Sequence, residues 1–197
     1  MKLYYSTNSP YARKVRVLIL ELNLTEGVEL LEADTKDLAG PVCTFNPLAK
    51  VPVLLTDDGI AVYDSPVISE FLAGNVATHN FPGVAPALKD KCLVSTADGI
   101  LDAGYAARLE KIRPQNFQWQ EFIDLQFGKI NRTLDRLDQD ANSLPHEATQ
   151  GAIALACALE WIQFRHAEGQ WLINRLQLAE WAQRFSQRPS MMATRPE

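Results

Sequence analysis

Two serine–proline pairs are the residues in this sequence whose types and spacing most directly suggest chemistry. Ser9-Pro10 and Ser65-Pro66 each join a residue that favours a helix N-cap to one that favours the first helical position. Such a helix start presents unpaired backbone N–H groups and the positive end of the helix dipole, which attract an anion. Capping alone would explain either pair, but two pairs, with Asp64 beside the second, predict a binding site for an anionic ligand.

The segment NPLAKVPVLL, residues 46–55, supplies a third candidate for ligand binding. Pro52 opens an apolar run typical of a strand, where proline is tolerated at the first position or at an edge. A cis Val51–Pro52 bond would turn the backbone N–H and C=O of Val51 outward, where they could pair with an extended peptide. Only about 5–6% of X–Pro bonds in folded proteins are cis, so an ordinary strand start is the alternative.

The elements that must position these residues alternate between strand and helix. Short strand-like runs occupy residues 2–5, 28–33 and 51–64, and the last run contains Asp58-Gly59, a strong hairpin signal. Apolar residues follow Ser9 at helical spacing, and a second helix is predicted from Ser65 to Gly74. The predicted order is β-α-β-(loop or short helix)-β-β-α.

The character of the sequence changes after residue 75. Residues 76–87 contain two prolines and a glycine, which predicts a linker. Helical spacing then recurs over residues 88–112, 117–141, 149–166 and 174–187. The sequence therefore predicts an α/β domain at 1–75, a linker at 76–87 and an all-helical domain at 88–197.

Composition excludes several classes of protein. The 197 residues are 47% hydrophobic, enough for a core, and the net charge of -5 argues against a general nucleic-acid binder. We expect no membrane span, because no apolar run approaches about 18 residues. Three scattered cysteines without a C-x-x-C pair, and no visible secretory signal, predict a cytoplasmic protein. The three histidines lack metal-ligand spacing, so no metal is expected.

Several segments together resemble one family, the cytosolic glutathione S-transferases. SPYARKVRVLILELNL, NPLAKVPVL with DDG, and YDSPVISEFL resemble its thioredoxin-like N-terminal domain. LDAGYAARLEKIRP, FGKINRTLDRLD, GAIALACALEWIQFR and RPSMMATRP are similar to bacterial members with a serine at the N-terminal site. The resemblance covers nearly the whole chain. It implies a thioredoxin-like domain of order β-α-β-α-β-β-α, an all-α C-terminal domain and a homodimer.

The resemblance also implies a site for glutathione as co-substrate. Ser9 matches the serine, found in the theta- and zeta-like classes, whose hydroxyl donates a hydrogen bond to the glutathione sulfur. Val51 and Pro52 match the residue and the cis-proline beside the cysteinyl unit. Asp64 and Ser65 match the pair that holds the γ-glutamyl end.

Two further residues have alternative interpretations. Lys50 either meets the glycyl carboxylate of glutathione or is an ordinary surface lysine. Tyr11 either lines the mouth of the site or belongs to the core.

One segment departs from the family pattern. Members usually carry Ser/Thr-x-x-Asp at the start of the buried sixth helix, whereas TQGA, residues 149–152, keeps the hydroxyl and lacks the acid. The resemblance therefore predicts a cap weaker by about 1 kcal/mol if nothing compensates.

The implied function is transfer of the glutathione thiolate to small, largely apolar electrophiles, as in detoxification. The alternative is a protein of the same fold that uses the groove for a partner and catalyses nothing. Reduction of disulfides or dehydroascorbate is disfavoured because the key position, Ser9, is not a cysteine.

Overall fold

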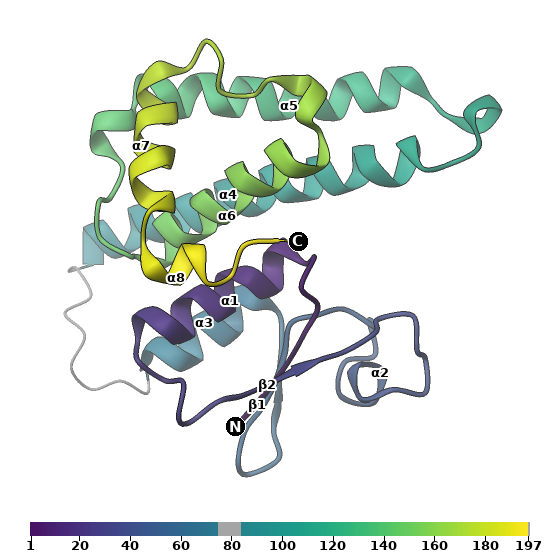
Figure 1. Cartoon of the computed structure of the whole chain (residues 1–197), viewed down its shortest axis with the longest axis vertical. Coiled ribbons are helices and arrows are strands. Elements are labelled where there is room, and N and C mark those ends of the chain that lie inside the picture. Colours follow the sequence, from purple (N-terminus) through teal and green to yellow (C-terminus); the bar gives the residue numbers. More distant parts are fainter. Residues whose placement is uncertain (75–83, 197) are drawn as a thin grey trace. The chain divides into compact units, whose positions relative to one another are not determined.

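The computed structural model describes residues 1–74 and 84–196 (Figure 1). Contacts divide the chain into two compact units, the first from residues 1–87 and 189–197, the second from residues 88–188. The predicted linker at 76–87 falls largely outside the described residues, but its last part is helical, because α4 begins at Val84. Pro86 is compatible with this helix start because first-turn N–H groups have no acceptor within the helix.

In the described part of the first unit, a mixed sheet of four strands has the order β2-β1-β3-β4. β1 (Lys2–Tyr5) runs parallel to β2 (Glu29–Glu32) and antiparallel to β3 (Val53–Leu55). β3 pairs antiparallel with β4 (Ala61–Val62) through the predicted hairpin, where Gly59 has a φ of 84°. Glycine adopts this left-handed conformation without steric cost, which explains the turn.

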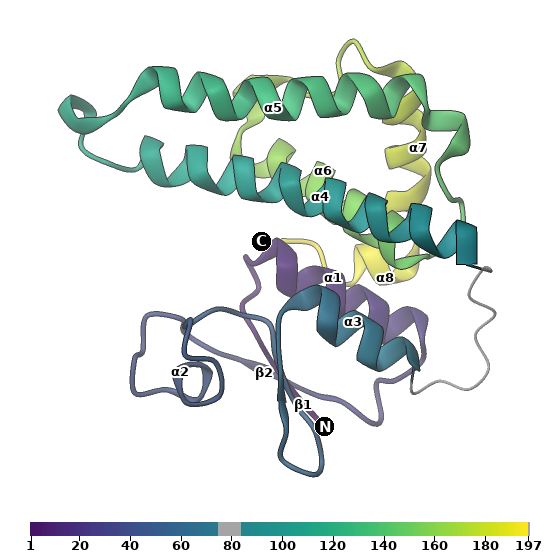
Figure 2. The same cartoon turned by 180° about the vertical axis from the view of Figure 1, so that it is seen from behind.

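Helices complete the first unit in the predicted order. α1 (Pro10–Glu21) follows β1, α2 (Pro41–Phe45) precedes β3, and α3 (Ser65–Gly74) follows β4. α1 and α3 lie side by side, as Figures 1 and 2 show. The predicted β-α-β-α-β-β-α order of a thioredoxin-like domain is thus confirmed.

Side chains alternate in direction along the strands, and both faces of the sheet are buried. Leu3 lies opposite Leu54, and both side chains are completely buried. The next pair, Tyr4 and Val53, faces the other way and packs with Val42 of α2. Successive strand residues point to opposite faces, so each of these pairs contributes to a different apolar layer.

The C-terminal segment belongs by its contacts to the first unit, although the sequence-based boundary assigned it to the helical domain. α8 (Pro189–Met192) packs on α1. The guanidinium of Arg13, 2% exposed, donates from Nη2 to the Met191 carbonyl at 3.1 Å and from Nε to the Thr194 hydroxyl at 3.3 Å. A buried charge requires such acceptors, which explains why the tail docks here.

The second unit is helical, as predicted. Its main helices are α4 (Val84–Lys111), α5 (Gln120–Gln139), α6 (Gln150–Arg165) and α7 (Leu176–Ser186). α4 and α5 form a long antiparallel pair (Figures 1 and 2), and α6 is buried along most of its length. An apolar surface all round a helix is typical of a central core position. None of the helices in the described part of the chain is both long and apolar enough to cross a membrane.

Tryptophans anchor the packing of this unit at three of four positions. The indole of Trp171 donates to the His166 carbonyl at 2.7 Å, and that of Trp181 donates to the Pro145 carbonyl at 2.9 Å. The fourth, Trp119, lies just before α5 and is 59% exposed, so it is not part of this packing.

A carboxylate of another helix, α4, accepts hydrogen bonds at the N-terminus of α6. Thr149 is the N-cap, and its hydroxyl oxygen accepts from Ala152 N at 3.2 Å. Asp90 of α4 accepts from the Thr149 hydroxyl, and both its carboxylate oxygens lie 3.1 Å from Gly151 N. The acid that TQGA lacks is therefore supplied by a residue 59 positions earlier in the chain.

A buried histidine ends α6. The His166 side chain is 1% exposed, and its Nε2 lies 2.9 Å from the Gly104 carbonyl oxygen. Its Nδ1 lies 3.6 Å from Glu168, which also pairs with Lys111. Burial lowers the pKa of His166, and Lys111 lowers it further, while the Gly104 carbonyl and Glu168 partly offset these effects.

This lowered pKa predicts a loss of stability in acid. Below the ordinary histidine pKa of about 6.5, the unfolded chain binds a proton that folded His166 resists, so the free energy of unfolding should decrease as pH falls. Urea titrations at about pH 7.5 and about pH 5.5 measure this decrease. His166→Asn should show a smaller decrease, while His146→Gln, at an exposed histidine, should match the unmodified protein. Equal pH dependence in the His166 variant would contradict the prediction.

Candidate functional site

Strand directions bring four segments to one edge of the sheet, here called the ligand edge. The carboxyl ends of β1 and β2 lie at this edge because the two strands are parallel. β3 is antiparallel to β1 and begins there, and β4 is antiparallel to β3 and ends there. The segments that meet at the ligand edge include Ser9, Glu32, Val51 and Asp64.

Ser9 is the N-cap of α1, as the sequence predicts. Its backbone is extended, with φ −83° and ψ 116°, and its Oγ accepts from Ala12 N at 3.2 Å. Its own N–H donates to the Ser6 carbonyl at 3.0 Å. The cap bond uses a lone pair of the hydroxyl oxygen and not its hydrogen, so the half-buried hydroxyl can still donate to a ligand.

The second helix start differs from the prediction by one residue. α3 begins at Ser65, and the carbonyl of Asp64 accepts from Ile68 N at 2.9 Å. Asp64, rather than Ser65, therefore flanks the helix, and the predicted N-cap role of Ser65 is wrong. Pro66 occupies the second helical position, where its missing N–H is still without cost. Ser65 is 1% exposed, while the Asp64 side chain is exposed to solvent.

The Val51–Pro52 bond, which the sequence left open, is cis. The Tyr63–Asp64 bond is cis as well. The side-chain amide of Asn46 donates to the Lys50 carbonyl at 2.9 Å and fastens the segment before β3. The Lys50 side chain is exposed, and Val51 is half-buried. The predicted trio of Lys50, Val51 and Pro52 therefore lies together at the start of β3.

Tyr11 lies in the first turn of α1, two residues after Ser9, and is half-buried. The Nζ of Lys14 lies 5.6 Å from its ring centroid. Its role as a lining residue stays a prediction.

Thr7 and Glu32 also lie at the ligand edge, and no sequence motif marked them. The Thr7 hydroxyl donates to Glu32 Oε1, and the Thr7 N–H lies 3.4 Å from the same oxygen. These bonds from Thr7 lower the pKa of Glu32, and the positive charge of Arg16 adds to the effect. Tyr5 is the strand partner of Glu32, so the signal that predicts this contact is the parallel β1–β2 register.

Comparison with known proteins agrees with this arrangement. The glutathione S-transferase N-terminal domain matches residues 8–74. The uncharacterized GST-like protein YibF of Escherichia coli (strain K12) is 34% identical over 201 residues, covering 100% of this chain and 98% of its own. This chain belongs to the glutathione S-transferase family.

Solved structures of other glutathione S-transferases resemble this one over its whole length. A family member from Pseudomonas fluorescens Pf-5 with bound glutathione is 36% identical, with a TM-score of 0.92, covering 100% of this chain and 98% of its own. A second structure of a P. fluorescens Pf-5 family member, with bound S-(propanoic acid)-glutathione, is 35% identical, with a TM-score of 0.90 and complete coverage of both chains. The thioredoxin-like first domain and the helical second domain are thus those of glutathione S-transferases.

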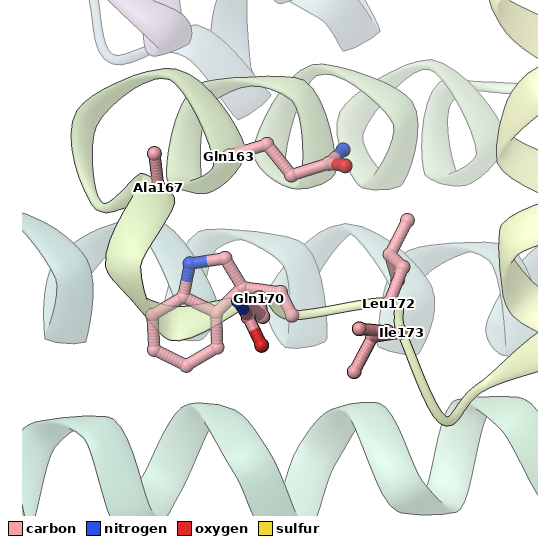
Figure 3. Close-up of a pocket in the computed structure, with 6 residues that line it drawn as sticks. Gln163, Ala167, Gln170, Leu172 and Ile173 are labelled. Atoms are coloured by element: carbon pink, nitrogen blue, oxygen red, sulfur yellow. The ribbon is translucent and has the colours of Figure 1, made fainter.

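The helical domain also contains a pocket, and none of the predicted site residues lines it. Figure 3 shows this pocket of about 390 Å³ between the end of α6 and the turn after it. It is lined by Gln163, Ala167, Gln170, Trp171, Leu172 and Ile173. These side chains include no acid, base or thiol that could activate a reactant. Within the described residues, no group of three or more His, Cys, Asp or Glu side chains could hold a metal ion.

Proposed function

We propose that this protein conjugates the glutathione thiolate to small, largely apolar electrophiles, with Ser9 as the catalytic residue. The observation that carries the proposal is the Ser9 hydroxyl at the N-terminus of α1. A free thiol has a pKa of about 8.5 and is mostly protonated at neutral pH. A hydroxyl donor and the helix dipole both favour the anion, so together they would raise the fraction of reactive thiolate.

In this proposal, the rest of the ligand edge holds the tripeptide. The backbone of Val51, before cis Pro52, pairs with the cysteinyl unit as a neighbouring strand would. The exposed Asp64 carboxylate receives the γ-glutamyl ammonium, and Ser65 with the first turn of α3 receives its carboxylate. The glutathione bound to the P. fluorescens relative supports glutathione as the ligand of this site.

Two further assignments complete the proposed site. The exposed Lys50 ammonium meets the glycyl carboxylate, and Tyr11 lines the mouth. We also propose a cytoplasmic homodimer, which rests on the family and on the cysteine content.

The reaction forms one carbon–sulfur bond. In substitution, the sulfur lone pair attacks the electrophilic carbon and the leaving group departs with its bonding pair. In conjugate addition, the displaced electron pair moves into the activating group and a solvent proton completes the product. Ser9 donates its hydrogen bond to the sulfur before attack and thereby keeps it ionised. The S-substituted glutathione in a P. fluorescens relative supports a product of this kind.

The direct test is a glutathione titration of the purified protein, followed by assay with an aryl halide. Calorimetry should detect binding, and thiolate absorbance against pH should give a thiol pKa below the free value of about 8.5. Product should then form at a rate proportional to protein concentration. Failure to bind glutathione would refute the proposal and favour the non-catalytic alternative. A stable partner protein that remains bound to this protein during purification would support that alternative.

A further inference from the structure

Glu32 reaches across the ligand edge to the loop that carries Ser9. This loop, residues 6–9, connects β1 to α1 and is here called the serine loop. Inside it, Ser9 N donates to the Ser6 carbonyl at 3.0 Å. Thr7 connects this loop to β2, because its hydroxyl donates to Glu32 Oε1 and its N–H lies 3.4 Å from the same oxygen.

The backbone of Glu32 is held by its pairing with β1, and its exposed side chain extends from there. Glu32 is paired with Tyr5 in the parallel register, and the pairing continues with Ala33 N donating to the Tyr5 carbonyl at 2.8 Å. Arg16 of α1 packs its guanidinium 4.6 Å from the centroid of the Tyr5 ring. The Glu32 carboxylate thus extends from the end of β2, which is hydrogen-bonded to Tyr5. Tyr5 is the residue directly before the serine loop.

We propose that Glu32 is a positioning residue, which holds the serine loop through Thr7 and so fixes the Ser9 hydroxyl relative to the glutathione sulfur. The inference rests on the proposed function. A small displacement of a group that touches the reacting atom can cost a large factor in rate, so a tie at Thr7 affects the hydroxyl two residues away.

The charge of Glu32 gives a way to separate this role from a purely electrostatic one. A carboxylate near a thiolate disfavours the thiolate, so electrostatics alone predicts that any neutral replacement lowers the thiol pKa. Positioning predicts a different order. Glu32→Gln keeps a carbonyl oxygen as acceptor for Thr7, whereas Glu32→Ala removes the acceptor altogether.

The first experiment follows amide hydrogen exchange of Ser9 by NMR in the free protein. We expect exchange to accelerate about tenfold in Glu32→Ala and in Thr7→Val, and to change less than about threefold in Glu32→Gln. The Glu32→Ala/Thr7→Val double variant should exchange no faster than either single variant, because both remove the same tie. Glu29→Ala is the matched control, since Glu29 lies at the other end of β2 and pairs with Lys2. Unchanged exchange in Glu32→Ala would overturn the inference.

The second experiment measures kcat, glutathione affinity and the bound thiol pKa in the same variants. We expect kcat to fall about tenfold in Glu32→Ala with a raised thiol pKa, glutathione affinity to stay within about twofold, and Glu32→Gln to retain most of the activity. A lower thiol pKa in both Glu32 variants would show a through-space charge effect and overturn positioning. If the unmodified protein does not ionise glutathione, the proposed function fails, and the exchange measurement alone decides whether Glu32 holds the loop.

Discussion

Replacing Ser9 by alanine is expected to lower kcat for glutathione conjugation by about 100-fold, the usual effect of removing one preorganised donor to a reacting anion. The affinity for glutathione should change less than about threefold, because the residues proposed to hold the peptide ends are intact. Steady-state kinetics with an aryl halide and calorimetric titration with glutathione measure the two quantities. The bound thiol pKa should rise in parallel with the loss of kcat.

The control for Ser9 must separate catalysis from capping, because Ser9 Oγ also accepts from Ala12 N. Ser9→Ala removes both roles and should cost about 1 kcal/mol of folding free energy, whereas Ser9→Gly costs only a few tenths. Ser9→Gly should therefore lose as much kcat as Ser9→Ala while remaining more stable. Ser9→Thr keeps a hydroxyl and should retain the largest share of turnover. Turnover in Ser9→Ala equal to that of the unmodified protein would refute the role of Ser9.

Local patterns predict the order of elements because their signals lie within a few residues. The period of apolar residues after Ser9 and the Asp58-Gly59 turn each depend only on neighbouring positions, and both are confirmed by α1 and the β3–β4 hairpin. The docking of the tail is different. The burial of Arg13 depends on its hydrogen-bond acceptors, Met191 and Thr194. These lie more than 170 positions away in the chain, so no local pattern predicts the contact.

The candidate site likewise contains residues that a local pattern predicts and residues that it does not. Ser9 carries its own signal, because a serine before a proline marks a helix start, and the structure places it at the N-cap. Glu32 carries none, because its contact with Thr7 depends on the register by which β2 pairs with β1. The one-residue difference at Ser65 arises because a proline fits either of the first two helical positions, so the motif cannot fix the boundary.

Gly151→Ala is expected to reduce the free energy of unfolding by about 3 kcal/mol, because α6 approaches α4 at this glycine. A Cβ at residue 151 would lie 2.7 Å from the backbone carbonyl oxygen of Asp90 and 2.9 Å from the Cβ of Leu93. Backbone cannot rotate away as a flexible side chain can, so the two helices would have to separate. Urea unfolding followed by circular dichroism measures the change, and Gly99→Ala is the matched control. Gly99 lies in α4, is exposed and has open space around the Cβ position, so its replacement should stabilise by about 0.5–1 kcal/mol.

The same contact makes Asp90 the substitute for the acid that TQGA lacks. Asp90→Ala leaves Gly151 N and the Thr149 hydroxyl without their acceptor and should cost about 2 kcal/mol, whereas Asp90→Asn keeps one acceptor oxygen and should cost about half as much. Combining Asp90→Ala with Gly151→Ala should cost less than the sum of the two single changes, because the alanine at 151 no longer meets the carboxylate. Full additivity would show that the carboxylate and the Cβ at residue 151 do not interact, and a Gly151→Ala protein as stable as Gly99→Ala would show that α6 does not depend on this close approach. Unchanged stability in Asp90→Ala would show that Asp90 does not replace the acid that TQGA lacks.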